Sequence, residues 1–299
     1  LFFEGDGRLP LLYLPALLSG LGGLALIIGL PLVIGQLLVF LGGLGLVGLF
    51  GLILKRQTAL HTIVMSLGAV CLAAGEGLWL AGRPLHIVVW WWIGFLVLTI
   101  AGERLELSRL TKLTQNQQTG FTAVNGLFLL GILVSLFWYV NGVRIAGLGL
   151  LGIALWLFRY DIARRTIRRT GQPRFAAASL LSGYFWLAAA GLIALIFGGV
   201  PAGLRYDAML HAVFLGFTFG MIFGHAPVIF PAIANVTMRY HPRFYLHLVL
   251  LNLTLLLRII ADLAAWPELR AWGGLLNALV LVIFLVNTVT AVQRQSAGT

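Results

Sequence analysis

Long stretches of almost uninterrupted apolar residues alternate with short polar segments along this chain. A helix needs about 20 mostly apolar residues to cross the hydrocarbon core of a bilayer. The pattern predicts ten such helices, of which the sixth is short, at about 10–30, 33–54, 58–80, 86–102, 121–140, 145–159, 175–199, 206–233, 243–265 and 271–291. The sequence therefore predicts an all-α fold, a polytopic transmembrane helical bundle of about ten spans, forming a single integral membrane domain over residues 1–299.

Composition supports this fold class. Hydrophobic residues make up 60% of the chain and charged residues only 10%, whereas an average soluble chain has about 25% charged residues. A soluble enzyme is therefore excluded. The single cysteine, Cys71, excludes a disulfide framework and a metal cluster made of cysteines alone.

The basic residues are distributed unevenly about the ten predicted spans. Most of the 20 lysines and arginines, with both termini, fall on one side, and the other side carries only Arg83, Arg144, Arg205 and Arg270. The positive-inside rule makes the basic side cytoplasmic, which predicts a multi-pass protein of the cell membrane. We assign the net charge of +11 to topology rather than to nucleic acid. The basic segment 159–174 is expected to lie against anionic lipid headgroups.

The eighth predicted span carries two histidines, His211 and His225, fourteen residues apart. At about 3.6 residues per turn they return to nearly one face, roughly 21 Å apart along the axis, with Thr218 midway. This is the separation found in cytochrome b helices, where each histidine binds a different haem. Tyr206 and Asp207, at the start of the span, are interpreted as polar groups of a helix end.

Glycines and prolines give the same span further features. Gly216, Gly220 and Gly224 follow one another at intervals of four residues and predict the close approach of another helix. Pro227 and Pro231 are expected to distort the span just after His225.

The ninth predicted span has a polar stripe of its own. His247, Thr254 and Arg258 point in nearly one direction, and Asp262 lies one turn beyond Arg258. An arginine inside a membrane span needs a partner. Asp262 is the simplest choice, and Glu76 or a haem propionate is the alternative.

The predicted topology divides the remaining histidines between the two membrane surfaces. His86 and His211 lie near the outer surface, and His61, His225 and His247 lie toward the cytoplasm. Two neutral imidazoles supply both axial ligands of haem b, so the outer pair predicts one haem site. The inner three histidines predict a second haem or a metal ion such as copper. His61 and His86 are equally well explained as hydrogen-bonding residues of the membrane interface.

Several stretches resemble the NnrS-like membrane proteins, which act in nitric oxide stress and are similar to subunit I of the haem-copper oxidases. The stretches of this chain that carry the resemblance are the run from His211 to Pro227 and the segments 168–175, 183–186 and 273–278. The resemblance implies an all-helical fold with histidine-bound haem and with copper, and it extends to His211 and His225. The Gly-His-Thr-Gly-Arg motif of that family and the adjacent histidine pair of the oxidases are missing from this sequence.

The leading hypothesis is a membrane protein with one or two haems b, for electron transfer or for handling nitric oxide or another diatomic gas. His211 with His86 would hold one haem, His225 with His247 or His61 the second site, and Arg258 would tune the haem by its charge. Its partners would be the lipid bilayer and a membrane redox partner or larger complex. Two alternatives stay open: a non-catalytic integral subunit of a respiratory or photosynthetic complex, and a secondary transporter, which requires a broken helix in each half of the chain.

Overall fold

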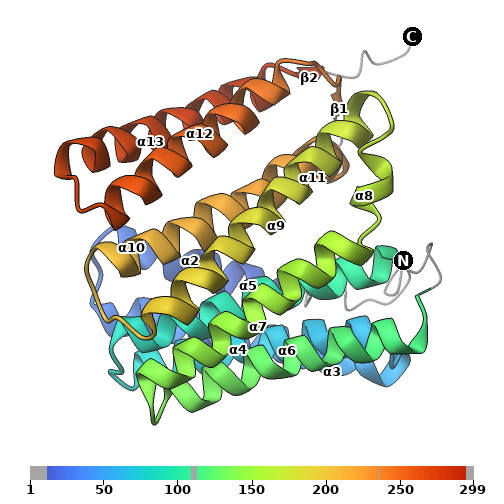
Figure 1. The fold of residues 1–299 in the computed structure, drawn as a ribbon. Helices are drawn as coiled ribbons and strands as arrows, with labels where there is room; N and C mark the ends of the chain where they lie inside the picture. Colours follow the sequence, from blue (N-terminus) through green and yellow to red (C-terminus); the bar gives the residue numbers. More distant parts are fainter. Residues whose placement is uncertain (1–11, 109–112, 235, 294–299) are drawn as a thin grey trace. The chain divides into compact units, whose positions relative to one another are not determined.

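The structure, a computed structural model, describes residues 12–108, 113–234 and 236–293. These residues are almost entirely helical, which confirms the all-α prediction (Figure 1). The chain divides into two compact units, Leu1–Arg109 and Leu110–Thr299.

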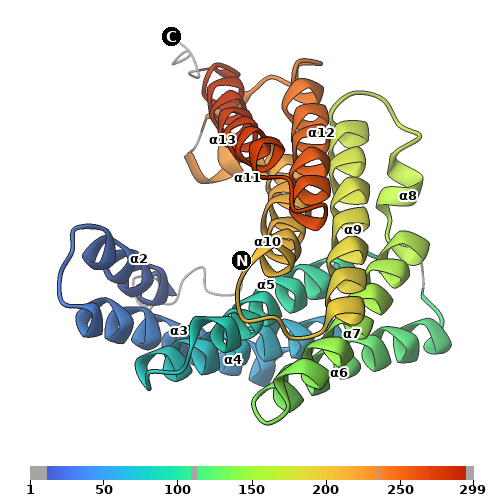
Figure 2. The same cartoon turned by 60° about the vertical axis from the view of Figure 1, so that its left-hand side comes forward.

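The first unit is a row of antiparallel helices, each packed against the next (Figure 2). Its helices are α2 (Leu14–Ile27), α3 (Leu32–Arg56), α4 (Leu60–Leu80) and α5 (Leu85–Leu107). Gly29 and Gly82 stand directly after α2 and α4 with φ of 77° and 76°. Glycine adopts this left-handed conformation without a steric penalty, so the chain can reverse within a few residues.

The second unit continues this pattern and then becomes more complex. Its helices are α6 (Gln115–Ser135), α7 (Tyr139–Tyr160), α8 (Ala163–Thr166), α9 (Gly171–Phe197), α10 (Leu204–His211), the π-helix η2 (Ala212–Phe219), α11 (Gly220–Ala234), α12 (Phe244–Leu263) and α13 (Pro267–Val289). Two short strands, β1 (Thr237–Met238) and β2 (Val292–Gln293), pair antiparallel. Helix α9 packs against α7 on one side and against the α10–η2–α11 rod on another, and α12 and α13 form an antiparallel pair.

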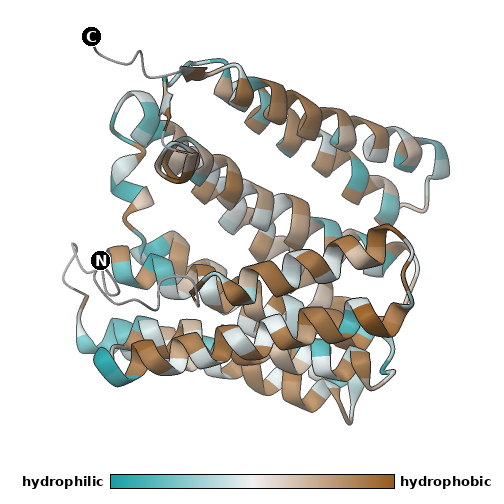
Figure 3. Ribbon diagram, turned by 180° about the vertical axis from the view of Figure 1, so that it is seen from behind, coloured by the Kyte–Doolittle hydropathy of each residue, from teal (hydrophilic) through white to brown (hydrophobic). Residues whose placement is uncertain are grey.

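The described helices match the predicted membrane spans. Nine of them are long and apolar enough to cross a membrane, with α10, η2 and α11 counted as one continuous span, and α2 is a shorter apolar helix. Apolar residues run along the length of the helices, whereas polar residues gather toward helix ends and connections (Figure 3), and many large apolar side chains are exposed. Such a surface is stable against lipid rather than water. The chain is a membrane protein whose helices contact the bilayer.

The eighth span differs from its prediction in one respect. The segment between His211 and His225 contains the π-helix η2, in which hydrogen bonds run from residue i to i+5. Thr218 Oγ1 donates to the carbonyl of Val213, five residues earlier, at 3.2 Å. The assumption of an even 3.6-residue repeat is therefore wrong for this stretch, and spacing alone does not place the two histidines on one face.

The predicted roles of the glycines and prolines can be compared with the structure. A Cβ atom added at Gly220 would lie 3.2 Å from the Cα of Gly183, and one at Gly224 would lie 3.2 Å from the carbonyl oxygen of Ala176. Both neighbours belong to α9, so the close approach of a helix is confirmed. Helix α11 continues through both prolines. Pro231 cannot donate to the carbonyl of Pro227, and the side chain of Gln172 donates to it instead, at 3.2 Å.

Candidate functional site

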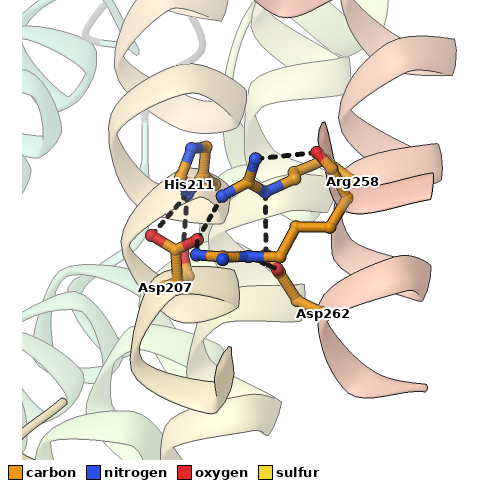
Figure 4. A network of polar contacts seen from close by, with 5 residues as sticks. Asp207, His211, Arg258 and Asp262 are labelled. Atoms are coloured by element: carbon orange, nitrogen blue, oxygen red, sulfur yellow. Dashed lines mark hydrogen bonds and ion pairs between the residues drawn. The ribbon is translucent and has the colours of Figure 1, made fainter. Parts of the chain in front are cut away.

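Five polar side chains from three helices of the second unit meet in one cluster (Figure 4). Asp207 and His211 belong to α10, Arg258 and Asp262 to α12, and Arg270 to α13. Residues four apart share one face of a helix, so the two pairs on α10 and α12 each project together. We call these five residues the ionic cluster.

The two carboxylates and two guanidinium groups of the ionic cluster alternate in a closed ring. Asp262 accepts from Nε of Arg258 at 3.1 Å and from Nε of Arg270 at 2.8 Å. Oδ2 of Asp207 accepts from Nη2 of Arg258 and, at 2.9 Å, from Nη2 of Arg270. Nη1 of Arg258 also donates to the main-chain carbonyl of Arg270 at 2.9 Å. The charges of the four side chains balance within the ring.

Burial is graded across the ionic cluster. The exposed side-chain fraction is 0% for Asp262, 11% for Arg258, 25% for Asp207 and 40% for Arg270. A carboxylate as buried as Asp262 is stable only when it is paired and hydrogen-bonded. Asp262 therefore depends on both arginines, while Arg270 forms the open edge of the cluster.

The packing of α12 on α13 brings Arg270 back to this position. The connection between the helices is short, and a Cβ atom at Gly273 would lie only 2.9 Å from the Cα of Arg258. Because glycine has no side chain, the two backbones approach closely at this point. The polar stripe predicted on α12 faces α13 along its length, through the pairs His247–Asn287 at 3.3 Å, Thr254–Asn277 at 2.7 Å and Arg258–Arg270 O at 2.9 Å.

His211 lies at the edge of the ionic cluster, where α10 passes into the π-helix. Its Nδ1 is 2.8 Å from the carbonyl oxygen of Asp207 and 3.4 Å from Oδ1 of the same residue. Nδ1 therefore carries the proton and donates to the carbonyl, which leaves the lone pair on Nε2. Single π-helical turns inside α-helices occur frequently at functional sites.

Asp207, His211 and Asp262 offer ligand atoms within 4.8 Å of one another, which is compatible with a metal site. Both carboxylates, however, already accept hydrogen bonds from arginines. A cation at this point would have to displace guanidinium groups that balance the same charges. The donor set of the ionic cluster therefore does not fit a resident metal ion.

The other predicted ligands of the second unit, His225 and His247, lie outside this cluster. His225 is half-buried on α11, with Nδ1 2.7 Å from the carbonyl oxygen of Met221. His247 is 2% exposed, and its ring packs against Phe175, Phe223, Phe244 and Phe284. Phe223 contacts His247, and His225 lies two residues further along α11, rotated by about 200°. His225 therefore points away from the side of α11 that contacts His247, and His247 is enclosed by the four phenyl rings.

The remaining predicted ligands belong to the first unit. His61 is buried in α4, with Nε2 3.2 Å from Thr62 Oγ1 and 3.8 Å from Glu106 Oε1. His86 is half-buried near the start of α5. Glu76 is buried in α4. The pairing of His86 with His211 and the joining of His61 to an inner metal or haem site stay predictions.

The predicted partner of Arg258 is confirmed as Asp262, but two members of the ionic cluster were missed. Asp207 was interpreted as a polar group of a helix end and Arg270 as a charge on the outer side. Asp207 lies 51 residues from Arg258 and 63 residues from Arg270 in the sequence. The available signal was the i,i+4 spacing of Asp207 and His211, which places a carboxylate beside the histidine.

A family model described as a domain of unknown function (DUF8744) matches residues 7–293, and the chain belongs to this family. No curated protein matches the chain, and no solved structure matches it.

Proposed function

We propose that this membrane protein binds a b-type haem through His211 and serves electron transfer or the handling of a diatomic gas such as nitric oxide. The observation that carries the proposal is the hydrogen bond from Nδ1 of His211 to the carbonyl of Asp207, at 2.8 Å. Histidines that bind metals almost always donate their second nitrogen in this way, because the bond sets the tautomer and orients the ring. The sequence resemblance around His211 and His225 supports the same ligand.

The residues around His211 fit this role in different ways. When bound, a haem supplies a one-electron couple at its iron, whose potential responds to the axial ligands and to nearby charge. Nε, Nη1 and Nη2 of Arg258 all donate inside the ionic cluster, so Arg258 holds the cluster together rather than a propionate. Arg270 is the more exposed arginine, and we assign it the contact with a haem propionate.

His225 is the second proposed ligand, for a separate haem or a copper ion. Its Nδ1 makes the same bond to the carbonyl four residues earlier, here that of Met221 at 2.7 Å. His247 does not join it, for the reasons of direction and packing given above.

A second candidate function is secondary transport, which the ionic cluster itself favours. Ionisable residues inside membrane bundles mark the paths of ions and protons. The side chains of Asp207 and His211 are both one-quarter exposed, so the open edge of the cluster can be reached from outside the helices. In this alternative His211 carries a proton and binds no haem.

Absorption spectroscopy separates the two functions. The full chain would be produced in haem-supplied cells, and oxidised and dithionite-reduced spectra would be followed by a pyridine haemochrome assay. We expect the parent protein to show the α band of haem b, and His211→Ala to lose at least half of the haem per chain. His241→Ala, which changes an exposed histidine outside the candidate sites, should keep the parent spectrum.

A colourless parent protein, or a His211→Ala variant with the full haem content, would refute the haem assignment. Proton uptake by liposomes containing the protein would then test transport. Loss of that uptake in His211→Ala, with uptake retained in His241→Ala, is the result that transport predicts.

A further inference from the structure

A basic pocket lies at the end of α7, where the chain turns into the short helix α8. Its volume is about 380 Å³, within the range of roughly 300–1,000 Å³ that is typical of small-molecule sites. The lining comes from the start of α6, the end of α7, α8 and the segment after it, and consists of Leu113, Gln117, Arg159, Tyr160, Asp161, Arg164, Arg165 and Arg168. We call it the arginine pocket.

Asp161 folds the chain so that this pocket forms. The residue has an extended conformation directly after α7, and its Oδ1 accepts from the main-chain N–H of Ala163 at 2.6 Å. This bond closes a turn between α7 and α8, because aspartate side chains readily accept from the main-chain N–H two residues further on. The arginines of α8 therefore stand beside Arg159 instead of continuing along the axis of α7.

The opposite wall is held in place by the first turn of α6. Thr114 and Gln117 form a reciprocal capping box, with the main-chain N–H of Thr114 donating to Gln117 Oε1 at 2.9 Å. Nε1 of Trp156 in α7 donates to the main-chain carbonyl of Gln117, also at 2.9 Å. These bonds tie α6 to α7, so the pocket has a preformed wall.

Positive charge dominates the arginine pocket, because four arginines face a single carboxylate. Asp161 is buried, and its Oδ1 is already used by the main chain. Nη1 of Arg164 donates to the carbonyl of Arg159 at 3.5 Å, and Arg159 lies over the ring of Tyr160. Within the described parts of the chain, the guanidinium groups of Arg165 and Arg168 have no ion pair and no hydrogen bond. Their charge and their donors are available to a ligand.

We propose that the arginine pocket binds a phosphate-bearing anion, with Arg165 and Arg168 donating to the phosphate oxygens and Arg159 and Arg164 adding charge. Guanidinium groups match phosphate through pairs of parallel N–H donors, which makes arginine the preferred residue for this recognition. The pocket lies at the end of a membrane-spanning helix, where lipid headgroups are found, and basic pockets at this level bind such headgroups. A soluble phosphate compound offers the same chemistry. The proposal is independent of the haem.

Binding to the full-length protein in detergent tests the proposal. The probes are a short-chain phosphatidic acid and inorganic phosphate, each titrated at constant ionic strength by calorimetry. The test variant is Arg165→Ala/Arg168→Ala. The matched control is Arg169→Ala/Arg174→Ala, which removes the same charge from exposed positions outside the pocket lining.

We expect the test variant to bind at least tenfold more weakly than the parent and the control to bind within twofold of it. If phosphatidic acid binds and inorganic phosphate does not, the ligand is a lipid headgroup. If both probes bind with similar affinity, the ligand is a soluble phosphate compound. Absence of binding by the parent overturns the proposal, and so does an equal loss in the two variants, which would show attraction by net charge alone.

Discussion

The second unit contains two groups of arginines that follow opposite rules of charge balance. In the ionic cluster two arginines meet two aspartates in a closed ring. In the arginine pocket four arginines face one buried aspartate that is already bonded to the main chain. The two groups lie at opposite ends of α9, whose 27 residues extend over about 40 Å.

Burial explains the difference. Side-chain charges removed from water must be compensated inside the protein, and Asp262, with no exposed side-chain surface, is compensated twice. The arginines of the pocket are exposed, and the guanidinium groups of Arg165 and Arg168 have no partner among the described residues. The ionic cluster therefore uses its charges to join α10, α12 and α13, whereas the arginine pocket keeps its charges for a ligand. Substitutions should affect stability at the first site and binding at the second.

The largest effect is expected for Asp262→Ala. This change leaves two arginines facing each other with half of their negative partners removed. Breaking a buried pair by removing one partner costs about 3–5 kcal/mol. Thermal unfolding in detergent, followed by tryptophan fluorescence, measures the loss. Glu268→Ala removes an exposed carboxylate of α13 and should change stability by less than about 0.5 kcal/mol. Equal effects of the two substitutions would show that the ring does not stabilise the unit.

The next largest effect is expected for Gly273→Ala. Its new methyl group would meet the backbone of Arg258 at 2.9 Å and push α13 away from α12. Overpacking of this kind costs about 1–3 kcal/mol. Gly126→Ala on α6 is the control, because a Cβ atom there meets nothing within 4 Å. That control should be neutral or stabilise the helix by up to about 1 kcal/mol. An equally stable Gly273→Ala variant would contradict the close approach of the two helices.

A smaller effect is expected for the pair that closes the ring at its open edge. Asp207→Asn and Arg270→Gln, made singly and together, form a double-mutant cycle. Residues in direct contact show coupling of about 0.5–3 kcal/mol, and we expect about 1 kcal/mol because Arg270 is partly exposed and screened by water. The measurement is again thermal unfolding in detergent. Additive effects would mean that this bond contributes nothing to stability.

The smallest effect on stability is expected in the arginine pocket. Arg165→Ala/Arg168→Ala removes side chains that bond to no described partner, so stability should stay within about 0.5 kcal/mol of the parent in the absence of phosphate. The same variant should lose the stabilisation that a bound phosphate compound gives the parent protein. A large loss without ligand would show that these arginines hold the fold, as those of the ionic cluster do.

The sequence predicts one contact of the ionic cluster, but it does not predict the contacts between residues of different helices. The spacing of Arg258 and Asp262 predicted their contact, because residues four apart on a helix always lie side by side. No local signal indicated the contacts of Asp207 with Arg258 and Arg270, since these three residues belong to three different helices. The π-helix was also missed. Residues 212–219 read as an ordinary apolar helix, and nothing in their residue types indicates the change of hydrogen-bond register.

The arginine pocket shows the same limit. The sequence shows that segment 159–174 is strongly basic, and its expected position against lipid headgroups stays a prediction. A pocket requires that the chain fold back on itself, and the bond between Asp161 and the N–H of Ala163 produces that fold. The charge of a segment can be read from the sequence, because each charge belongs to one residue. The sequence does not show whether the charged residues line a pocket, because a pocket is formed by several segments together.

The pattern of residue types is enough to establish the class of the protein, the position of its helices and the glycine face of the eighth span. These features follow from the unfavourable free energy of placing polar groups in lipid, to which each residue along the chain contributes separately. The folded arrangement of the helices decides which charges are compensated and where the α-helical register changes. Those outcomes depend on contacts between helices that are distant in sequence, and hydrophobic pattern carries no information about which partner each polar side chain will meet.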